Sequence, residues 1–339
     1  MTKLIGQLRF LAGAIAVALL LAFAPPAVAQ QPTSVNPTAS AVKEDQLLQQ
    51  LRIISGRGSI PDTKSYNIEQ PAGREWREFR TVVLPWIGGV AILGMLLLLV
   101  VFYLWKGAVR LQSGRSGRTV VRFSAFERFV HWMTATCFII LGLSGLNITF
   151  GRSLLLPLMN PQTFTDWSQY AKYAHNYLSF PFTIGVVLIF LIWIAGNIPD
   201  STDVRWVKEG LGGIVDRSKH PPAYRFNAGQ KAIYWIVVLG GGAVAVTGYV
   251  LMFPFYGTTI QSMQIAQVVH GTVAVLFVAA MLAHIYIGTL GMEGAFEAMG
   301  TGTVDVNWAR EHHSLWLSEQ MAATGPNESR GQPSATPAE

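Results

Sequence analysis

The chain has 339 residues, of which 51% are hydrophobic and only 13% are charged. This composition is too apolar for an ordinary soluble protein and predicts an all-α integral membrane protein. The formal net charge of +6 is compatible with a nucleic-acid partner, but Lys and Arg cluster beside apolar segments, where they set membrane topology. We therefore expect no nucleic-acid binding.

The N-terminus has the pattern of a secretory signal peptide over residues 1–29. Basic residues precede an apolar segment, and two prolines are followed by the small residues Ala27 and Ala29. We expect cleavage after Ala29, with an uncleaved membrane anchor as the alternative. Residues 30–80 are rich in Pro, Ser, Thr and Gln, which predicts an exported, partly disordered polar segment.

Five further apolar segments follow, and each is long enough to cross a bilayer as a helix. They cover about 82–105, 126–150, 173–195, 232–253 and 267–290. The first carries no histidine, and we expect it to form an extra transmembrane helix over 81–106. The other four are expected to form a four-helix core domain within 120–320. Residues 321–339 are expected to be a disordered cytoplasmic tail.

The positions of the basic residues predict the orientation of these helices. Lys and Arg are frequent between the first and second segments and between the third and fourth, and they are rare in the other connections. Cytoplasmic loops of membrane proteins carry the excess of Lys and Arg. We therefore expect a multi-pass protein of the bacterial cytoplasmic (inner) membrane, with a periplasmic mature N-terminus and a cytoplasmic C-terminus.

Four histidines lie within the expected helices, and their depths match in pairs. His270 and His284 are fourteen residues apart in the last segment, which places them about 21 Å apart along nearly the same face of a helix. His131 lies near the cytoplasmic start of its helix, at the depth of His284. His175 lies near the periplasmic start of its own helix, at the depth of His270. The sequence therefore predicts two bis-histidine metal sites, one near each membrane surface.

Haem suits such sites, because two neutral imidazoles fill both axial positions of its iron and leave a centre adapted to electron transfer. The one cysteine, Cys137, lies in an apolar segment and no CxxCH motif is present, so the two haem b groups would be held non-covalently. Zinc fits less well, because neither depth offers a tetrahedral cluster with Cys, Asp or Glu. A proton relay would need more carboxylates than Glu127 within the last four helices.

Small residues near the ligand helices have two explanations. They would let a flat macrocycle approach the backbone, or they would simply pack membrane helices together, which is the simpler explanation for any one glycine. These residues are Gly142, Ser144, Gly145, Gly185 and Gly271.

The other three histidines are expected to have no cofactor role. His220 precedes two prolines in a cytoplasmic loop, and His312 and His313 lie in what reads as a polar tail.

Several short motifs within about residues 120–320 resemble the gamma subunit of membrane-bound formate dehydrogenase, a di-haem cytochrome b. Single tetrapeptides are weak evidence, whereas their order combined with the histidine spacing is strong. The motifs are Glu127-Arg128-Phe129-Val130-His131-Trp132, Leu143-Ser144-Gly145, Asn197-Ile198-Pro199-Asp200 and Phe226-Asn227-Ala228-Gly229-Gln230-Lys231, together with His270 and His284.

The resemblance implies a membrane anchor and electron conduit for a catalytic complex. In that family a molybdenum or tungsten alpha subunit oxidises formate outside the cytoplasmic membrane, and an iron–sulfur beta subunit passes the electrons to the outer haem. They then reach the inner haem and reduce a quinone near the cytoplasmic face. His175 and His270 would hold the outer haem and His131 and His284 the inner one, which agrees with the pairing by depth.

The family's quinone site lies beside the inner haem and uses an Asn-x-Gly-Gln motif. It matches Asn227, Gly229 and Gln230 here, with His284 close by. From the residues alone an ordinary helix cap and loop is the simpler explanation. Gly229 would let a ring approach the backbone, and Gln230 would donate to a quinone carbonyl, so the resemblance favours the quinone site.

The sequence departs from the four-helix form of that family at its front end, where the signal segment, the exported stretch and one helix are additional. The extra helix either packs beside the core or replaces an anchor that another subunit supplies. Three alternative functions stay open at this point. They are the cytochrome b subunit of a membrane-bound nickel–iron hydrogenase, a membrane scaffold without a redox role, and a transporter.

Overall fold

The computed structural model describes residues 72–216, 218–254 and 256–323. Five helical segments in these ranges are long and apolar enough to cross a membrane, which confirms the five spans predicted from the sequence. The chain is therefore a multi-pass all-α membrane protein. The spans are Gly73–Lys106, Ala125–Leu154, Pro161–Gly196, Ala228–Met252 and Ile260–Gly291.

The predicted signal peptide and most of the predicted exported segment, residues 1–71, lie outside the described residues. The rest of that segment, 72–80, is almost entirely helical and continuous with the extra transmembrane helix. This helix begins at Gly73, earlier than the sequence indicated, because Trp76 Nε1 donates to Gln267 Oε1 at 3.0 Å and so holds its polar first turns against the core. Its parts are α3 (Gly73–Glu78), the π-helical turn η2 (Phe79–Val83) and α4 (Leu84–Lys106).

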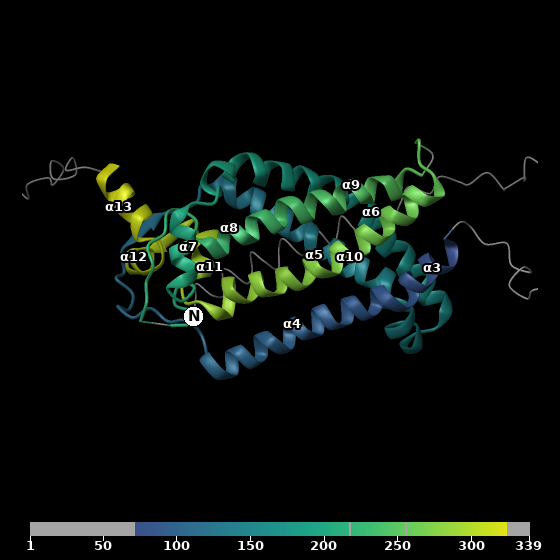
Figure 1. Ribbon diagram of the computed structural model, residues 1–339, viewed down its shortest axis with the longest axis horizontal. Helices are drawn as coiled ribbons and strands as arrows, with labels where there is room; N and C mark the ends of the chain where they lie inside the picture. The colour runs from purple at the N-terminus through teal and green to yellow at the C-terminus, as the bar shows by residue number, and fades with distance from the viewer. Residues whose placement is uncertain (1–71, 217, 255, 324–339) are drawn as a thin grey trace, which may run out of the picture.

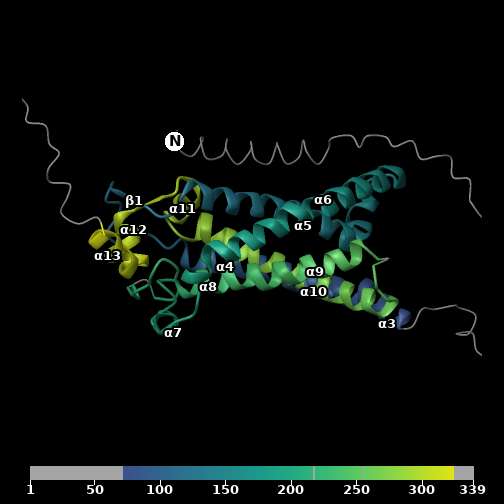
Figure 2. The ribbon, with the colours of Figure 1, turned by 90° about the horizontal axis from the view of Figure 1, so that it is seen from above.

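Two helical hairpins form the core of the molecule. In the first hairpin α5 packs against α6, and in the second α10 packs against a continuous rod made of α8, η5 and α9. Contacts of α6 with η5 and α9 join the hairpins into one four-helix bundle (Figures 1 and 2). The bounds are α5 (Ala125–Leu154), α6 (Pro161–Trp193), α8 (Ala228–Trp235), η5 (Ile236–Gly240), α9 (Gly241–Met252) and α10 (Ile260–Tyr286).

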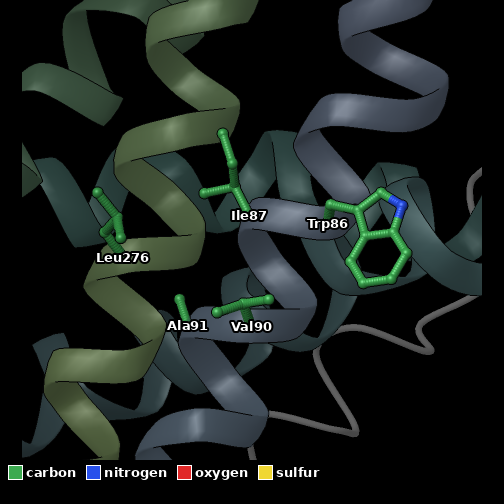
Figure 3. A pocket seen from close by; sticks show the side chains of 5 residues that line it. All are labelled: Trp86, Ile87, Val90, Ala91 and Leu276. Atoms are coloured by element: carbon green, nitrogen blue, oxygen red, sulfur yellow. The ribbon is translucent and has the colours of Figure 1, made fainter.

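The extra helix α4 lies along α10 on the outside of this bundle (Figure 1). Two glycines make the close approach feasible: a Cβ at Gly88 would lie 3.1 Å from Val275, and a Cβ at Gly271 would lie 2.7 Å from Leu84. The structure thus shows the extra helix packed beside the core, which is the first of the two arrangements left open by the sequence. Figure 3 shows an open, wholly apolar groove between the two helices, lined by Trp86, Ile87, Val90, Ala91 and Leu276.

A small folded cap closes the end of the bundle that carries the basic loops (Figure 2). Its strands are antiparallel, with Val120 opposite Val304, and the larger hydrophobic cluster of the described residues joins the cap to the helix ends. The cap helix α13 includes residues 321–323, so the predicted disordered tail cannot begin before 324, outside the described residues. The elements are β1 (Thr119–Val121), α7 (Ser201–Lys208), α11 (Ala295–Gly300), β2 (Thr303–Asp305), α12 (Val306–His312) and α13 (Ser314–Ala323).

Candidate haem-binding sites

The four intramembrane histidines lie in two pairs, and in each pair a ring on α10 is opposite a ring on another helix. The ring centres of His131 on α5 and His284 on α10 are 6.2 Å apart. Those of His175 on α6 and His270 on α10 are 6.1 Å apart. A metal ion bound by one nitrogen of each ring, through bonds of about 2 Å, would hold the two ring centres about 6 Å apart. The spacing therefore fits bis-histidine ligation at both depths.

The composition of these sites favours haem over a bare metal ion. Within residues 72–216, 218–254 and 256–323, no group of three or more His, Cys, Asp or Glu side chains is placed to hold a metal. A tetrahedral zinc site would need such a group. A haem iron needs only two axial ligands from the protein, because the macrocycle provides the other four.

Each histidine of the His175–His270 pair, called here the outer pair, has a hydroxyl from the preceding helix at its Nδ1 atom. Ser144 Oγ on α5 lies 2.9 Å from His175 Nδ1, and Thr247 Oγ1 on α9 lies 3.1 Å from His270 Nδ1. The sequence pointed to Ser144 as a small residue and as part of a motif, but not as a partner of histidine, and it did not point to Thr247. The signal was present, because each hydroxyl residue is followed directly by glycine.

Those glycines bring the histidine rings close to the backbone. A Cβ at Gly145 would lie 3.5 Å from His175 Cε1, and a Cβ at Gly248 would lie 3.2 Å from His270 Cε1. Gly185 has a different environment, because a Cβ there would collide with Thr134 on α5. The small residues therefore divide between those that touch a ring of the outer pair and those that pack helices, the latter including Gly271.

The His131–His284 pair, called here the inner pair, has a different environment. His131 Nδ1 is buried and has no hydrogen-bond partner among the described residues. Its ring lies edge-on to Trp132, with the ring centres 5.0 Å apart. The indole of Trp132 is fixed in turn, because its Nε1 donates to Met299 O at 2.9 Å. His131 is thus held by packing against Trp132, which is bonded to the cap, rather than by a hydrogen bond of its own.

Glu127, at the start of the first motif, links three parts of the chain near the inner pair. Its Oε1 atom accepts from Trp193 Nε1 at 2.8 Å and from Arg225 Nη2 at 2.7 Å. Its Oε2 atom accepts from the Ser124 backbone N–H at 2.9 Å, which completes a capping box at the start of α5. This carboxylate is therefore engaged in structure.

The two loop motifs meet through a buried lysine. Lys231 Nζ lies 2.7 Å from Asp200 Oδ2 and 2.9 Å from Asp203 Oδ2, and it donates to Ile198 O at 3.1 Å. The Lys231 side chain is only 5% exposed. The connection after α6 is thereby joined to the start of α8.

The Asn-x-Gly-Gln motif forms the first turn of α8. Asn227 Oδ1 accepts from the Gln230 N–H at 3.0 Å, and Gln230 Oε1 accepts from the Asn227 N–H at 3.2 Å. A Cβ at Gly229 would lie 3.2 Å from the ring of Trp206. The helix-cap explanation thus has a structural basis, and a quinone role would be an additional use of the same residues.

His312 and His313 do not lie in a polar tail, as the sequence suggested, because both are buried in the cap. His313 Nδ1 lies 2.7 Å from Tyr224 O, and its Nε2 atom lies 3.1 Å from Arg122 Nη2. Trp308 and neighbouring apolar residues fold this segment into the cluster that joins cap and bundle. Burial lowers the pKa of His312 to about 4 and the pKa of Arg122 to about 9, and it also lowers the pKa of His313. Because the Tyr224 carbonyl can only accept, His313 Nδ1 donates to it, and His313 Nε2 accepts a hydrogen bond from the Arg122 guanidinium.

Residues 122–302, just over half of the chain, match the family model described as prokaryotic cytochrome b561. The chain therefore belongs to the prokaryotic cytochrome b561 family. The fold and the paired histidines agree with this class, a membrane-spanning cytochrome that carries haem b.

Among curated proteins, the chain is similar to formate dehydrogenase cytochrome b556 subunits, which confirms the resemblance inferred from the motifs. It is 28% identical over 209 residues to the cytochrome b556(fdo) subunit of Escherichia coli K12, covering 61% of this chain and 95% of the relative. It is 26% identical over 216 residues to the nitrate-inducible cytochrome b556(Fdn) subunit of the same organism, covering 62% and 96%. The Haemophilus influenzae cytochrome b556 subunit is 26% identical over 208 residues, covering 60% and 84%.

Proposed function

We propose that this protein is the membrane-anchoring cytochrome b subunit of a respiratory formate dehydrogenase in the bacterial inner membrane. It would be the electron-transfer subunit of a formate:quinone oxidoreductase complex whose molybdenum or tungsten alpha subunit oxidises formate. One observation carries the proposal. Two histidine pairs, each with ring centres about 6 Å apart, lie at two depths in a chain similar to formate dehydrogenase cytochrome b556 subunits.

In this proposal His175 and His270 hold the outer haem b, and His131 and His284 hold the inner haem b. The haems supply one-electron redox chemistry when bound. The protein supplies four ligand nitrogens, and α10 sets the separation of the two sites because it carries one histidine of each pair. Electrons enter at the periplasmic end from an iron–sulfur beta subunit and leave at the cytoplasmic end.

Electron movement in this direction requires a driving force. Moving one electron inward against the membrane potential costs about 2.3 kcal/mol per 100 mV, so the redox drop from formate to quinone must supply it. A quinone that takes its protons from the cytoplasmic side separates charge without any proton crossing this subunit. The contacts of Glu127 support this scheme, because its carboxylate accepts hydrogen bonds from Arg225 and Trp193 and so has a structural role rather than a role in carrying protons.

We place the quinone beside the inner haem, at Asn227, Gly229 and Gln230, with His284 nearby. The Oε1 atom of Gln230 already accepts from the Asn227 N–H, so its Nε2 amide is the group that would donate to a quinone carbonyl. The helix cap would hold this amide at a fixed position. Asn227→Ala should then impair quinone reduction while haem content is preserved, and normal turnover would remove Asn227 from the site.

The names of the curated relatives favour formate over hydrogen as the source of electrons. Purification of the native complex separates these alternatives, because the co-purifying catalytic subunit contains either a molybdopterin-type cofactor or nickel and iron. Recovery of a nickel–iron partner would exclude the formate assignment.

Single alanine substitutions test the haem ligands. His175→Ala and His270→Ala should each lose the outer haem, and His131→Ala and His284→Ala should each lose the inner one, so that haem per chain falls by about half. His220→Ala, in an exposed loop, should keep both. Haem content and reduced-minus-oxidised spectra of the purified protein are the measurements. Retention of two haems by all four variants, or a wild-type spectrum without a b-type alpha band, would exclude this function.

A further inference from the structure

The outer pair has a hydrogen-bonding arrangement that occurs twice. Ser144 Oγ lies 2.7 Å from Ile140 O, one turn back on α5, as well as 2.9 Å from His175 Nδ1. A hydroxyl has one proton, and a carbonyl oxygen can only accept. The Ser144 hydroxyl therefore donates to Ile140 O and accepts from the Nδ1–H of His175.

Thr247 repeats this arrangement in the second hairpin. Its Oγ1 atom lies 2.6 Å from Ala243 O on α9 and 3.1 Å from His270 Nδ1. By the same reasoning the hydroxyl donates to Ala243 O and accepts from the Nδ1–H of His270. Both outer histidines are thus held with the proton on Nδ1, which leaves Nε2 unprotonated and able to bind a metal.

Hydroxyl groups bonded to the preceding turn are common in membrane helices and do not by themselves indicate a function. Here the second hydrogen bond, to a histidine of the neighbouring helix, distinguishes Ser144 and Thr247. Thr149 provides the contrast. Its Oγ1 atom donates to Gly145 O at 3.2 Å on the same helix as Ser144, and within the described residues it has no hydrogen bond to a histidine.

In the part of the chain that the structure describes, no hydroxyl forms a hydrogen bond with a histidine of the inner pair. His131 Nδ1 is buried without a hydrogen-bond partner in the described part of the chain. A hydrogen bond from Nδ1–H raises the basicity of the opposite ring nitrogen as a ligand. A more basic axial ligand stabilises the oxidised iron and lowers its midpoint potential, because hydrogen bonding around the ligands is one of the means by which a protein sets the potential of a haem.

We propose that Ser144 and Thr247 are positioning residues that fix the tautomer of the outer histidines and lower the midpoint potential of the outer haem below that of the inner haem. The proposal rests on the proposed function, since it takes His175 and His270 as haem ligands. The difference between the two potentials would favour electron flow in one direction. Electrons that enter at the outer haem then move to a site of higher potential, which opposes the cost of moving them inward.

Redox titration of the purified, haem-loaded protein, followed at the alpha band, tests the proposal. Thr247→Val removes the accepting oxygen at nearly constant volume, and Ser144→Ala removes the other one. Each should raise one of the two midpoint potentials, the double variant should raise it further, and the second haem should titrate as in wild type. Thr247→Ser keeps the hydroxyl and should restore the wild-type value. Thr149→Val is the matched control and should shift neither haem.

The haem that shifts is identified in a His131→Ala background, where only the outer haem should remain and should still respond to Thr247→Val. Unchanged potentials in variants that retain both haems would overturn the inference and leave the proposed function standing. A shift of the inner haem, an equal shift of both haems, or a Thr247→Ser variant that behaves like Thr247→Val would also overturn it. Wild-type protein without haem would instead remove the proposed function, and the inference with it.

Discussion

Glu127 shows how a polar side chain at the membrane border is stabilised in this molecule. A buried carboxylate loses free energy of hydration unless hydrogen bonds replace it. Glu127 is 9% exposed, and its oxygens receive the Trp193 indole, the Arg225 guanidinium and a backbone N–H of its own helix cap. Removing the carboxylate would leave these donors, one of them charged, without an acceptor.

We expect Glu127→Ala to lower the free energy of unfolding by about 1–3 kcal/mol, because a buried donor that loses its partner costs about that much. Thermal unfolding in detergent, followed by tryptophan fluorescence, measures the change. Glu209→Ala is the control: Glu209 pairs with Arg205 at 3.8 Å on the surface, and exposed pairs contribute at most about 1 kcal/mol. Equal destabilisation by both variants would contradict the role assigned to Glu127.

At the scale of elements, the membrane helices could be predicted and the cap could not. Each span is a long apolar run, and such a run has few alternatives to a membrane helix. The strands of the cap have three residues each, and Val120 pairs with Val304 far away in the chain. Elements this short are stabilised by tertiary packing rather than by their own sequence pattern. The burial of His313 was therefore beyond a local interpretation of the sequence.

The candidate site, too, could be predicted only in part. The pairing of the histidines follows from depth, which residue counting along a helix gives directly. The hydroxyl partner of His270 depends on which face of α9 is turned toward α10, and spacing within one helix does not define that contact. Thr247 was missed for this reason, and Ser144 was noted for its small size and its motif rather than for its contact with His175.

The packing of α4 on α10 leads to a prediction for neighbouring glycines. A Cβ at Gly88 would meet Phe150 at 3.0 Å and Val275 at 3.1 Å, whereas a Cβ at Gly89 would come within 4 Å of no other helix among the described residues. Gly88→Leu should therefore push α4 away from α10 and cost about 1–3 kcal/mol, and Gly89→Leu should be nearly neutral. Thermal unfolding in detergent measures both.

Haem content serves as the second measurement on these variants. Because α4 carries no histidine, Gly88→Leu should retain both haems. Loss of haem from Gly88→Leu alone would show that the extra helix is part of the cofactor sites, which would contradict an independent four-helix core.

At the scale of the whole molecule, α3 and the cap lie at opposite ends of the bundle (Figures 1 and 2). This follows from the five spans, because an odd number of crossings leaves the start of the first span and the end of the last on opposite sides. The basic residues Lys106, Arg110, Arg115, Arg118 and Arg122 lie at the end of α4 and in the connection from α4 to α5, which enters the cap. By the positive-inside rule the cap is expected in the cytoplasm and α3 in the periplasm. The cap would then cover the end where electrons leave for the quinone.

Reporter fusions test this topology. Green fluorescent protein placed after Ala323 should fluoresce in the cytoplasm, and alkaline phosphatase at the same position should be inactive. Phosphatase joined after Gly257, in the exposed loop between α9 and α10, should be active because that loop would face the periplasm. The reverse pattern of activities would invert the orientation and, with it, the direction of electron flow.

Both His270 and His284 belong to α10, an uninterrupted helix from Ile260 to Tyr286. Electron tunnelling slows exponentially as the gap between two redox centres widens, so thermal sliding of one helix past another would modulate the rate if each centre moved with its own helices. In the proposed function, one histidine ligand of each centre would belong to this same helix, which would limit how far the gap can fluctuate. We expect the transfer rate between the centres to be insensitive to the fluidity of the surrounding lipid.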